Sequence, residues 1–114
     1  LDMVELHDCF SIAELIATES LFLCEHGRYK EEFTDKRAYY HGGEMPVNIS
    51  GGLKSFGHPI GASGCRETYE VYKQIQGKAE ESSRQVKNAR LGMVHNQGGH
   101  PGRFICGAAI YGVP

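Results

Sequence analysis

The stretch GGLKSFGHPIGASG, residues 51–64, constrains the fold of this chain more than any other segment. Five of its fourteen residues are glycine, and a histidine and a proline stand side by side at its centre. Glycine and proline both weaken the interior of a helix or a strand. We therefore expect this stretch to connect two elements, and we expect its single histidine, His58, to have a task other than packing.

Size and charge restrict the class of protein. The chain has 114 residues, which suits one domain or part of one. Its 12 basic and 14 acidic side chains give a formal net charge of -2, without a basic stripe for nucleic acid or for a membrane surface. No apolar run of about 18 residues and no secretion signal is recognisable. We expect a cytoplasmic protein with no nucleic-acid or membrane partner.

The four cysteines are widely spaced and form no C-x-x-C pair, so we expect reduced thiols rather than disulfides or a metal site. Cys24, Cys65 and Cys106 lie in apolar segments and are expected to be small buried hydrophobic residues. The first residues, LDMVEL, read as a strand that is entered without a turn or cap. This beginning predicts that the chain is a fragment.

Hydrophobic spacing predicts an alternation of strands and helices. The expected elements are a strand at 3–6, a helix from 11 to 24, a strand at 46–50, a helix at 65–77, and strands at 89–94 and 103–111. Ser11 and Glu14 have capping-box spacing at the start of the first helix, and Gly27 is expected to end it. Residues 28–44 are expected to form a long surface loop, which could cover a substrate or a partner subunit.

This order predicts an α/β fold with a mixed sheet, in which crossover helices join neighbouring strands. The last two strands are expected to form an antiparallel hairpin around a turn at 97–102. Polar residues follow three of the predicted strands: His7 with its neighbours, His58, and His95 with Asn96. Because sites in α/β sheets form beyond the carboxyl ends of strands, these three corners are expected to converge.

Three kinds of chemistry fit the corners to different degrees. A phosphate cradle is disfavoured, because the glycine stretch lacks both the P-loop ending and the G-x-G-x-x-G spacing. A metal site of His7, His58 and His95 is disfavoured, because no zinc-binding spacing is present. A thiol beside an imidazole, Cys9 with His58, fits acyl-transfer or carbanion chemistry. The alternative for Cys9 is a small buried hydrophobic residue.

Three segments resemble one known family, the thiolases. Residues 48–64, NISGGLKSFGHPIGASG, resemble the thiolase signature N-x-x-G-G-x-x-x-x-G-H-P-x-G-x-[ST]-G. Residues 4–15, VELHDCFSIAEL, are similar to the HDCF motif of sterol-carrier-protein-type thiolases and of their bacterial and archaeal relatives. Residues 93–99, MVHNQGG, resemble the HN-x-G-G segment of the same group. The three segments occur in family order, and the resemblance covers the whole chain, residues 1–114.

The resemblance implies acyl transfer between coenzyme A thioesters, either thiolysis of a 3-ketoacyl-CoA or the reverse Claisen condensation, in fatty acid and lipid metabolism. It implies that His58 donates a hydrogen bond to the thioester oxygen in an oxyanion hole, and that His7 holds a water there. It also implies that Cys9 is an acid/base cysteine. A fixed donor of this kind contributes on the order of 3 kcal/mol to the transition state.

Further site residues follow from the same resemblance. Phe10 is expected near the pantetheine of coenzyme A, and the backbone around Gly98 is expected to help form a second oxyanion hole. His95, with Asn96, stands where other thiolases have an acid/base cysteine. Gly57 is expected to let the backbone come close to the substrate. Coenzyme A is expected as a co-substrate, without a tightly bound cofactor or a metal.

The resemblance further implies the C-terminal half-domain of the thiolase fold, without its first strand and helix. The acyl-accepting cysteine of the family lies in an N-terminal half, so the chain is expected to need that half and to be inactive without it. An oligomer is expected because thiolases are dimers or tetramers. Two alternatives stay open: a non-catalytic thiolase-like partner subunit, or a thiolase-like aldolase that cleaves CoA-linked side chains together with an OB-fold partner.

Overall fold

A mixed sheet of three strands forms the centre of the protein. The computed structural model describes residues 1–35 and 42–114. Strand β1 (Met3–Leu6) runs parallel to β2 (Leu91–His100), which pairs antiparallel with β3 (Arg103–Gly112) in the order β1-β2-β3. The predicted α/β class, the mixed sheet and the C-terminal hairpin are confirmed.

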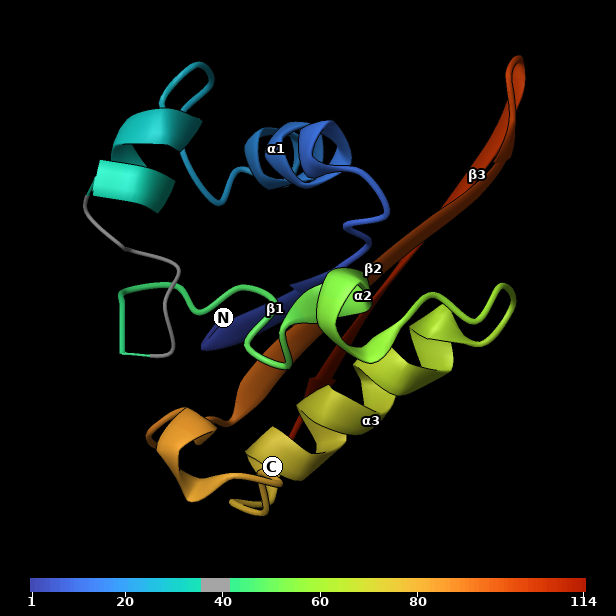
Figure 1. Ribbon diagram of the computed structural model, residues 1–114. Helices are drawn as coiled ribbons and strands as arrows, with labels where there is room; N and C mark the ends of the chain where they lie inside the picture. The colour runs from blue at the N-terminus through green and yellow to red at the C-terminus, as the bar shows by residue number, and fades with distance from the viewer. Residues whose placement is uncertain (36–41) are drawn as a thin grey trace.

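The two long helices lie on opposite sides of this sheet. Helix α1 (Ser11–Ser20) lies above the diagonal strands in Figure 1 and α3 (Ser63–Ile75) lies below them. Successive strand residues point to opposite faces, so one apolar cluster forms under each helix. The α1 side contains Val4, Leu6, Ala17, Cys24, Val47 and Met93, and the α3 side contains Met3, Ile49, Val71, Val86, Ala89 and Val94.

The segment 46–50 is bound to β1, but it is not the strand that was predicted. It forms one parallel bridge, between Val47 and Val4. Asn48 then adopts a positive φ of 49°, a left-handed backbone conformation that ends the extended segment. Its Oδ1 accepts a hydrogen bond from the Leu6 backbone N–H at 2.8 Å, so the chain turns away while it stays bound to β1.

The first helix begins at Ser11 as predicted, but its predicted cap and its predicted end are wrong. Phe10, not Ser11, is the N-cap, and it makes no side-chain capping bond. The Ser11 hydroxyl instead accepts a hydrogen bond from Lys54 Nζ at 2.8 Å. The helix ends at Ser20 rather than near Gly27, because Phe22 adopts a left-handed φ of 55°.

Short helices occur in segments that were expected to be irregular. Helix α2 (Gly52–Phe56) lies inside the glycine-rich stretch, η1 (Lys30–Asp35) is a turn of π-helix, and η2 (Ser82–Arg84) is a turn of 3₁₀-helix. The predicted loop 28–44 is therefore partly helical, and its residues 36–41 lie outside the described residues. Helix α3 begins two residues before the predicted start.

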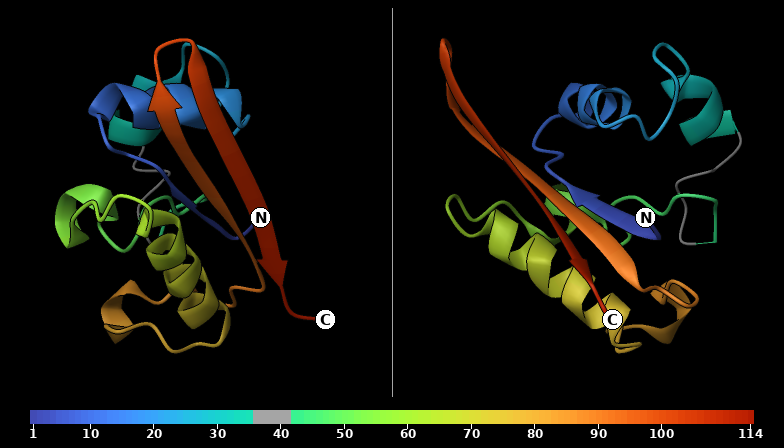
Figure 2. Two further views of the ribbon diagram at one scale, coloured as in Figure 1. Left: turned by 90° about the vertical axis from the view of Figure 1, so that its right-hand side faces the viewer. Right: turned by 180° about the vertical axis from the view of Figure 1, so that it is seen from behind.

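The second strand is longer than the sequence pattern predicted. Strand β2 continues through His95 to His100, and the connection to β3 is the two-residue turn Pro101–Gly102. The turn predicted at 97–102 is therefore wrong in its length. Residues 97–100 belong to β2, because their backbone groups pair with β3. The hairpin tip extends beyond the rest of the molecule in the right-hand view of Figure 2.

All of β3 is exposed, including its apolar residues. Cys106 on β3 and Cys65 on α3 are exposed too, so the prediction that they are buried is wrong, whereas Cys24 is buried. The neighbours of Cys106 are largely apolar, but among the described residues no second layer covers β3. Cys65 stands between Gly64 and Arg66. Within the described ranges, a helix with the length and hydrophobicity needed to span a membrane does not occur.

Candidate functional site

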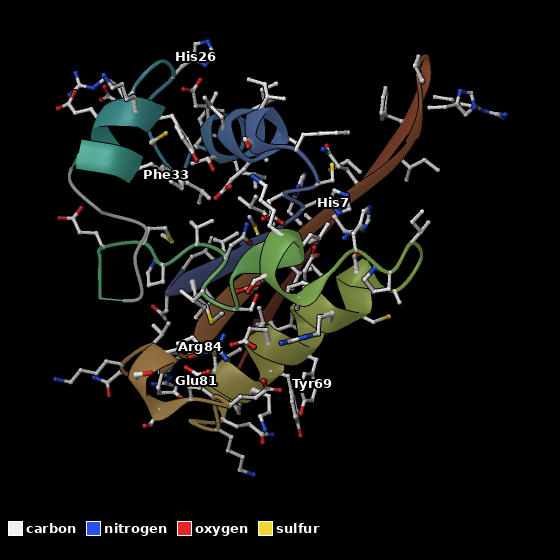
Figure 3. The ribbon with its side chains drawn as sticks, viewed as in Figure 1. His7, His26, Phe33, Tyr69, Glu81 and Arg84 are labelled. Carbon is white, nitrogen blue, oxygen red and sulfur yellow. The ribbon has the colours of Figure 1, made fainter. Side chains whose placement is uncertain are left out.

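The first two predicted corners meet in the structure. His7 lies at the carboxyl end of β1, and His58 lies in the loop between α2 and α3. Their rings stand edge to face, with centroids 4.9 Å apart and planes at 79°. His7 is buried in the middle of the molecule, whereas His26 is at the outer surface (Figure 3).

The strand geometry explains why His7 and Asp8 have different tasks. The His7 backbone N–H donates to the His95 carbonyl at 2.9 Å, which keeps the ladder with β2 going one residue beyond β1. Asp8 is buried, and its Oδ1 accepts a hydrogen bond from the Leu53 N–H at 2.7 Å. The His7 side chain thus belongs to the site, and the Asp8 side chain accepts a hydrogen bond from a backbone N–H in the first turn of α2.

Gly52 makes that contact possible. It has a φ of 65°, and a Cβ at this position would collide with the Asp8 carboxylate. A glycine therefore lets the start of α2 approach Asp8 closely. These glycines were expected to disfavour a helix, but α2 begins at them. Gly51 supplies the left-handed N-cap of α2, and Gly52 leaves room because it has no side chain.

His58 is presented to the outside by the end of α2. Gly57, with a φ of 93°, turns the chain out of the helix, and the His58 residue is exposed. Its Nδ1 lies 2.7 Å from the hydroxyl of buried Ser63, at the start of α3. That hydroxyl also lies 3.3 Å from the Pro59 carbonyl. The hydroxyl has a single hydrogen, so the tautomer of His58 sets whether Nδ1 accepts from it or donates to it.

Asn96 sets the position of the ring hydrogen of His7. Its side-chain Nδ2 lies 3.0 Å from His7 Nδ1. An amide nitrogen only donates, so His7 Nδ1 accepts and the ring hydrogen sits on Nε2. Burial and the neighbouring His58 lower the pKa of His7, which keeps the ring neutral. The His7 imidazole can therefore offer an Nε2–H donor.

Two buried carboxyl groups, which were not predicted from the sequence as site residues, lie on β1 and α3. Glu67 of α3 accepts from Asn96 Nδ2, and burial raises its pKa to about 7. Glu5 of β1 accepts from the Ser50 hydroxyl at 2.7 Å, and burial raises its pKa to about 8. A signal for Glu67 was present in the sequence, since it recurs at helical spacing with Val71 on the face that α3 buries.

The remaining predicted residues are spread around this pair. His95 lies on the α1 side of the sheet, opposite to Asn96, because adjacent strand residues alternate. Its ring is buried, its Nδ1 has no hydrogen-bond partner among the described residues, and burial lowers its pKa. The thiol of Cys9 is half-buried, and among the described residues it makes no hydrogen bond to either imidazole.

Phe10 and Gly98 flank the site without closing it. Phe10 is 70% exposed at the start of α1. Gly98 is exposed on β2, two residues beyond Asn96 and on the same face of the sheet. Within residues 1–35 and 42–114, no group of three His, Cys, Asp or Glu side chains is placed to hold a metal ion.

The arrangement places two imidazoles side by side in a polar, partly buried site, and the His7 ring offers a neutral hydrogen-bond donor. A donor of this type stabilises an oxygen on which negative charge develops. The structure is thus a small α/β domain with a mixed sheet, a glycine-rich connection and two paired imidazoles.

Comparison with known proteins agrees with that class. Residues 1–103 match the model of the family described as "Thiolase C-terminal domain-like", and the chain belongs to this family. It is 46% identical over 102 residues to an "Acetyl-CoA acetyltransferase" of Methanothermobacter thermautotrophicus, covering 90% of this chain and 26% of the relative.

Other relatives carry different names. The chain is 40% identical over 111 residues to "Non-specific lipid-transfer protein-like 2" of Caenorhabditis elegans, covering 97% of this chain and 25% of the relative. It is 42% identical over 98 residues to "Sterol carrier protein 2" of Homo sapiens, covering 86% of this chain and 17% of the relative. The chain therefore spans about a quarter or less of the length of these relatives.

Proposed function

We propose that this chain is the C-terminal part of an enzyme that transfers acyl groups between coenzyme A thioesters, by thiolysis of a 3-ketoacyl-CoA or by Claisen condensation. The observation that carries the proposal is the pair of imidazoles, His7 and His58, with their Nδ1 atoms bound to Asn96 and Ser63. In this proposal the Nε2–H groups of both rings serve a substrate oxygen.

The proposed chemistry needs such donors. Removal of a proton beside a thioester leaves an enolate, whose oxygen carries negative charge. An Nε2–H of His58 stabilises that oxygen, and a water held by His7 provides a second hydrogen bond. The acyl-accepting cysteine is supplied by an N-terminal thiolase half, and Cys9 exchanges the proton on carbon.

We assign the other flanking residues to substrate binding around the two imidazoles. Phe10, exposed at the start of α1, packs against the pantetheine of coenzyme A, and Gly57 gives the substrate access to the backbone near His58. The backbone around Gly98 forms a second oxyanion hole, with His95 behind it. Coenzyme A is a co-substrate in this scheme.

The exposed edge of the sheet supports a larger assembly. Phe104, Ile105 and Ile110 on β3 are 70%, 77% and 61% exposed. Phe104 and Ile110 lie on one face of β3 and Ile105 lies on the other, so apolar side chains are exposed on both faces of the hairpin. We propose that the nucleophile half covers this hairpin, and that the isolated chain has no turnover.

A chimera tests the proposal. The segment of the Methanothermobacter thermautotrophicus acetyltransferase that matches this chain is replaced by residues 1–114, and thiolysis of acetoacetyl-CoA is measured. We expect thiolysis in the chimera and none in the isolated chain. The variant His58→Ala should lower the turnover by roughly 100-fold, because one oxyanion donor is lost.

The matched control is His100→Ala, which removes an exposed histidine at the hairpin tip and should leave turnover and melting temperature unchanged. A folded chimera without thiolysis would favour the non-catalytic partner subunit. Cleavage of a CoA-linked side chain in the presence of an OB-fold protein would favour the aldolase. An equal loss of activity in both histidine variants would remove His58 from the mechanism.

A further inference from the structure

The carboxyl group of Glu67 lies near the His7 ring without a hydrogen bond to it. Glu67 is 0% exposed, in the second turn of α3. Its contact to His7, between Oε1 and Nδ1, is 3.9 Å, too long for a hydrogen bond. A hydrogen-bonded connection between the two side chains therefore needs a group between them.

Asn96 is that group. Its Nδ2 lies 3.2 and 3.0 Å from the two carboxyl oxygens of Glu67, and 3.0 Å from His7 Nδ1. A side-chain amide nitrogen carries two hydrogens, so it can serve both partners at the same time. The amide thus links an acid on a helix to a ring on a strand.

The ionised carboxylate decides which way the amide points. A carboxylate only accepts hydrogen bonds, so the opposite amide orientation would place the Asn96 carbonyl oxygen against it without a hydrogen between them. Such a buried, unsatisfied pair costs free energy. With the amide nitrogen fixed toward Glu67, its second hydrogen meets His7 Nδ1, and the ring hydrogen must lie on Nε2.

We propose that Glu67 is a positioning residue, which acts through the Asn96 amide to hold His7 in the tautomer that carries its hydrogen on Nε2. This orientation is a property of the chain alone. The use of this Nε2–H as a donor to a water or a substrate oxygen rests on the proposed acyl transfer.

The test is ¹⁵N NMR of the histidine rings in the 114-residue chain at pH 8.5, where Glu67 is ionised. The His7 signals are assigned by their loss in His7→Asn. A single Nε2–H tautomer gives two widely separated ring-nitrogen shifts, and we expect this pattern for His7 in the unmodified chain. In Glu67→Leu the separation should collapse toward the average of a tautomer mixture.

The neighbouring carboxyl group provides the matched control. Glu70 is equally buried on α3, but it accepts from Gln74 and Arg66. Glu70→Gln should therefore leave the His7 shifts unchanged. Glu67→Gln, whose carbonyl can still accept from Asn96, should largely restore the single tautomer.

Two further measurements keep the inference testable if Glu67→Leu does not fold. The unmodified chain alone overturns it if His7 carries its hydrogen on Nδ1. Asn96→Ala should mix the tautomers, since the linking amide is gone, and an unchanged single tautomer there would also overturn it. These outcomes do not depend on turnover, so a chimera without thiolysis would contradict the proposed function and leave this inference standing.

Discussion

The rings of His7 and His58 pack edge to face at 4.9 Å, although the residues come from a strand and a loop 51 positions apart. Each ring has its Nδ1 satisfied by a different neighbour, an amide for His7 and a hydroxyl for His58. The contact thus joins two motifs into one site whose remaining nitrogens are available to a ligand.

Ser63→Ala tests how His58 is held. The change removes the hydroxyl 2.7 Å from Nδ1, and one neutral hydrogen bond is worth about 1 kcal/mol. We expect turnover of the chimera to fall by about fivefold, because the ring loses its preferred orientation, and we expect Ser63→Thr to restore it. Ser82→Ala, at an exposed serine of η2, is the control. Loss of turnover in both alanine variants would argue against a specific role for the hydroxyl.

Gly52→Ala tests the close approach of α2 to Asp8. A left-handed alanine costs roughly 1–2 kcal/mol, and the collision with a buried carboxylate adds about 1–3 kcal/mol. The free energy of unfolding, measured in urea, should fall by the sum of these two costs. Gly77→Ala has nearly the same φ, 67° against 65°, but open space around its Cβ, so it should show the first cost only. Equal losses in the two variants would mean that Asp8 moves away freely.

Glu5→Gln tests the buried carboxyl of β1. Its pKa rises from 4.5 to about 8 on burial, so the folded state binds the proton more tightly than the unfolded state. This group then makes the free energy of unfolding decrease as the pH rises from about 5 to about 8, by about 1.4 kcal/mol per pH unit for one proton.

Glutamine at position 5 cannot titrate, so the difference in unfolding free energy between variant and parent should change across this pH range in favour of the variant. Taking the difference cancels the slopes of His7 and His95, which titrate in both proteins, whereas Glu67 lies close enough to Glu5 to respond to the change. Denaturation in urea at several pH values measures it. A difference that stays constant with pH would show that Glu5 is ionised throughout.

Gly92→Ala tests the packing of α3 on the sheet. A Cβ at Gly92 would lie 2.6 Å from a Val71 methyl group, and valine in a helix has one strongly preferred rotamer. We expect a loss of about 1–3 kcal/mol in the free energy of unfolding from this overpacking. In the double variant Gly92→Ala, Val71→Ala, each change relieves the other, so the total loss should be smaller than the sum of the single losses. Additive losses would contradict the contact.

Much of the fold could be predicted because it follows from local patterns. Residues 3–6 are a strand, and residues 103–111 fall within β3, as their apolar runs indicated. The errors lie where long-range contacts override the local pattern. The helix predicted to reach residue 24 ends at Ser20, and the glycine-rich stretch contains α2, which is held by Asp8 from a different element.

The sequence by itself determined the family and the position of His7 and His58 at the ends of their elements, because these depend on motifs and spacing along the chain. Only the tertiary structure decided the partners of these rings. The parallel register, with Leu6 opposite His95, brings Asn96 next to His7 across 89 positions, and α3 adds Glu67 beneath them. A strand register is a property of paired backbones, so no local pattern could reveal that His7 lies beside the amide of Asn96.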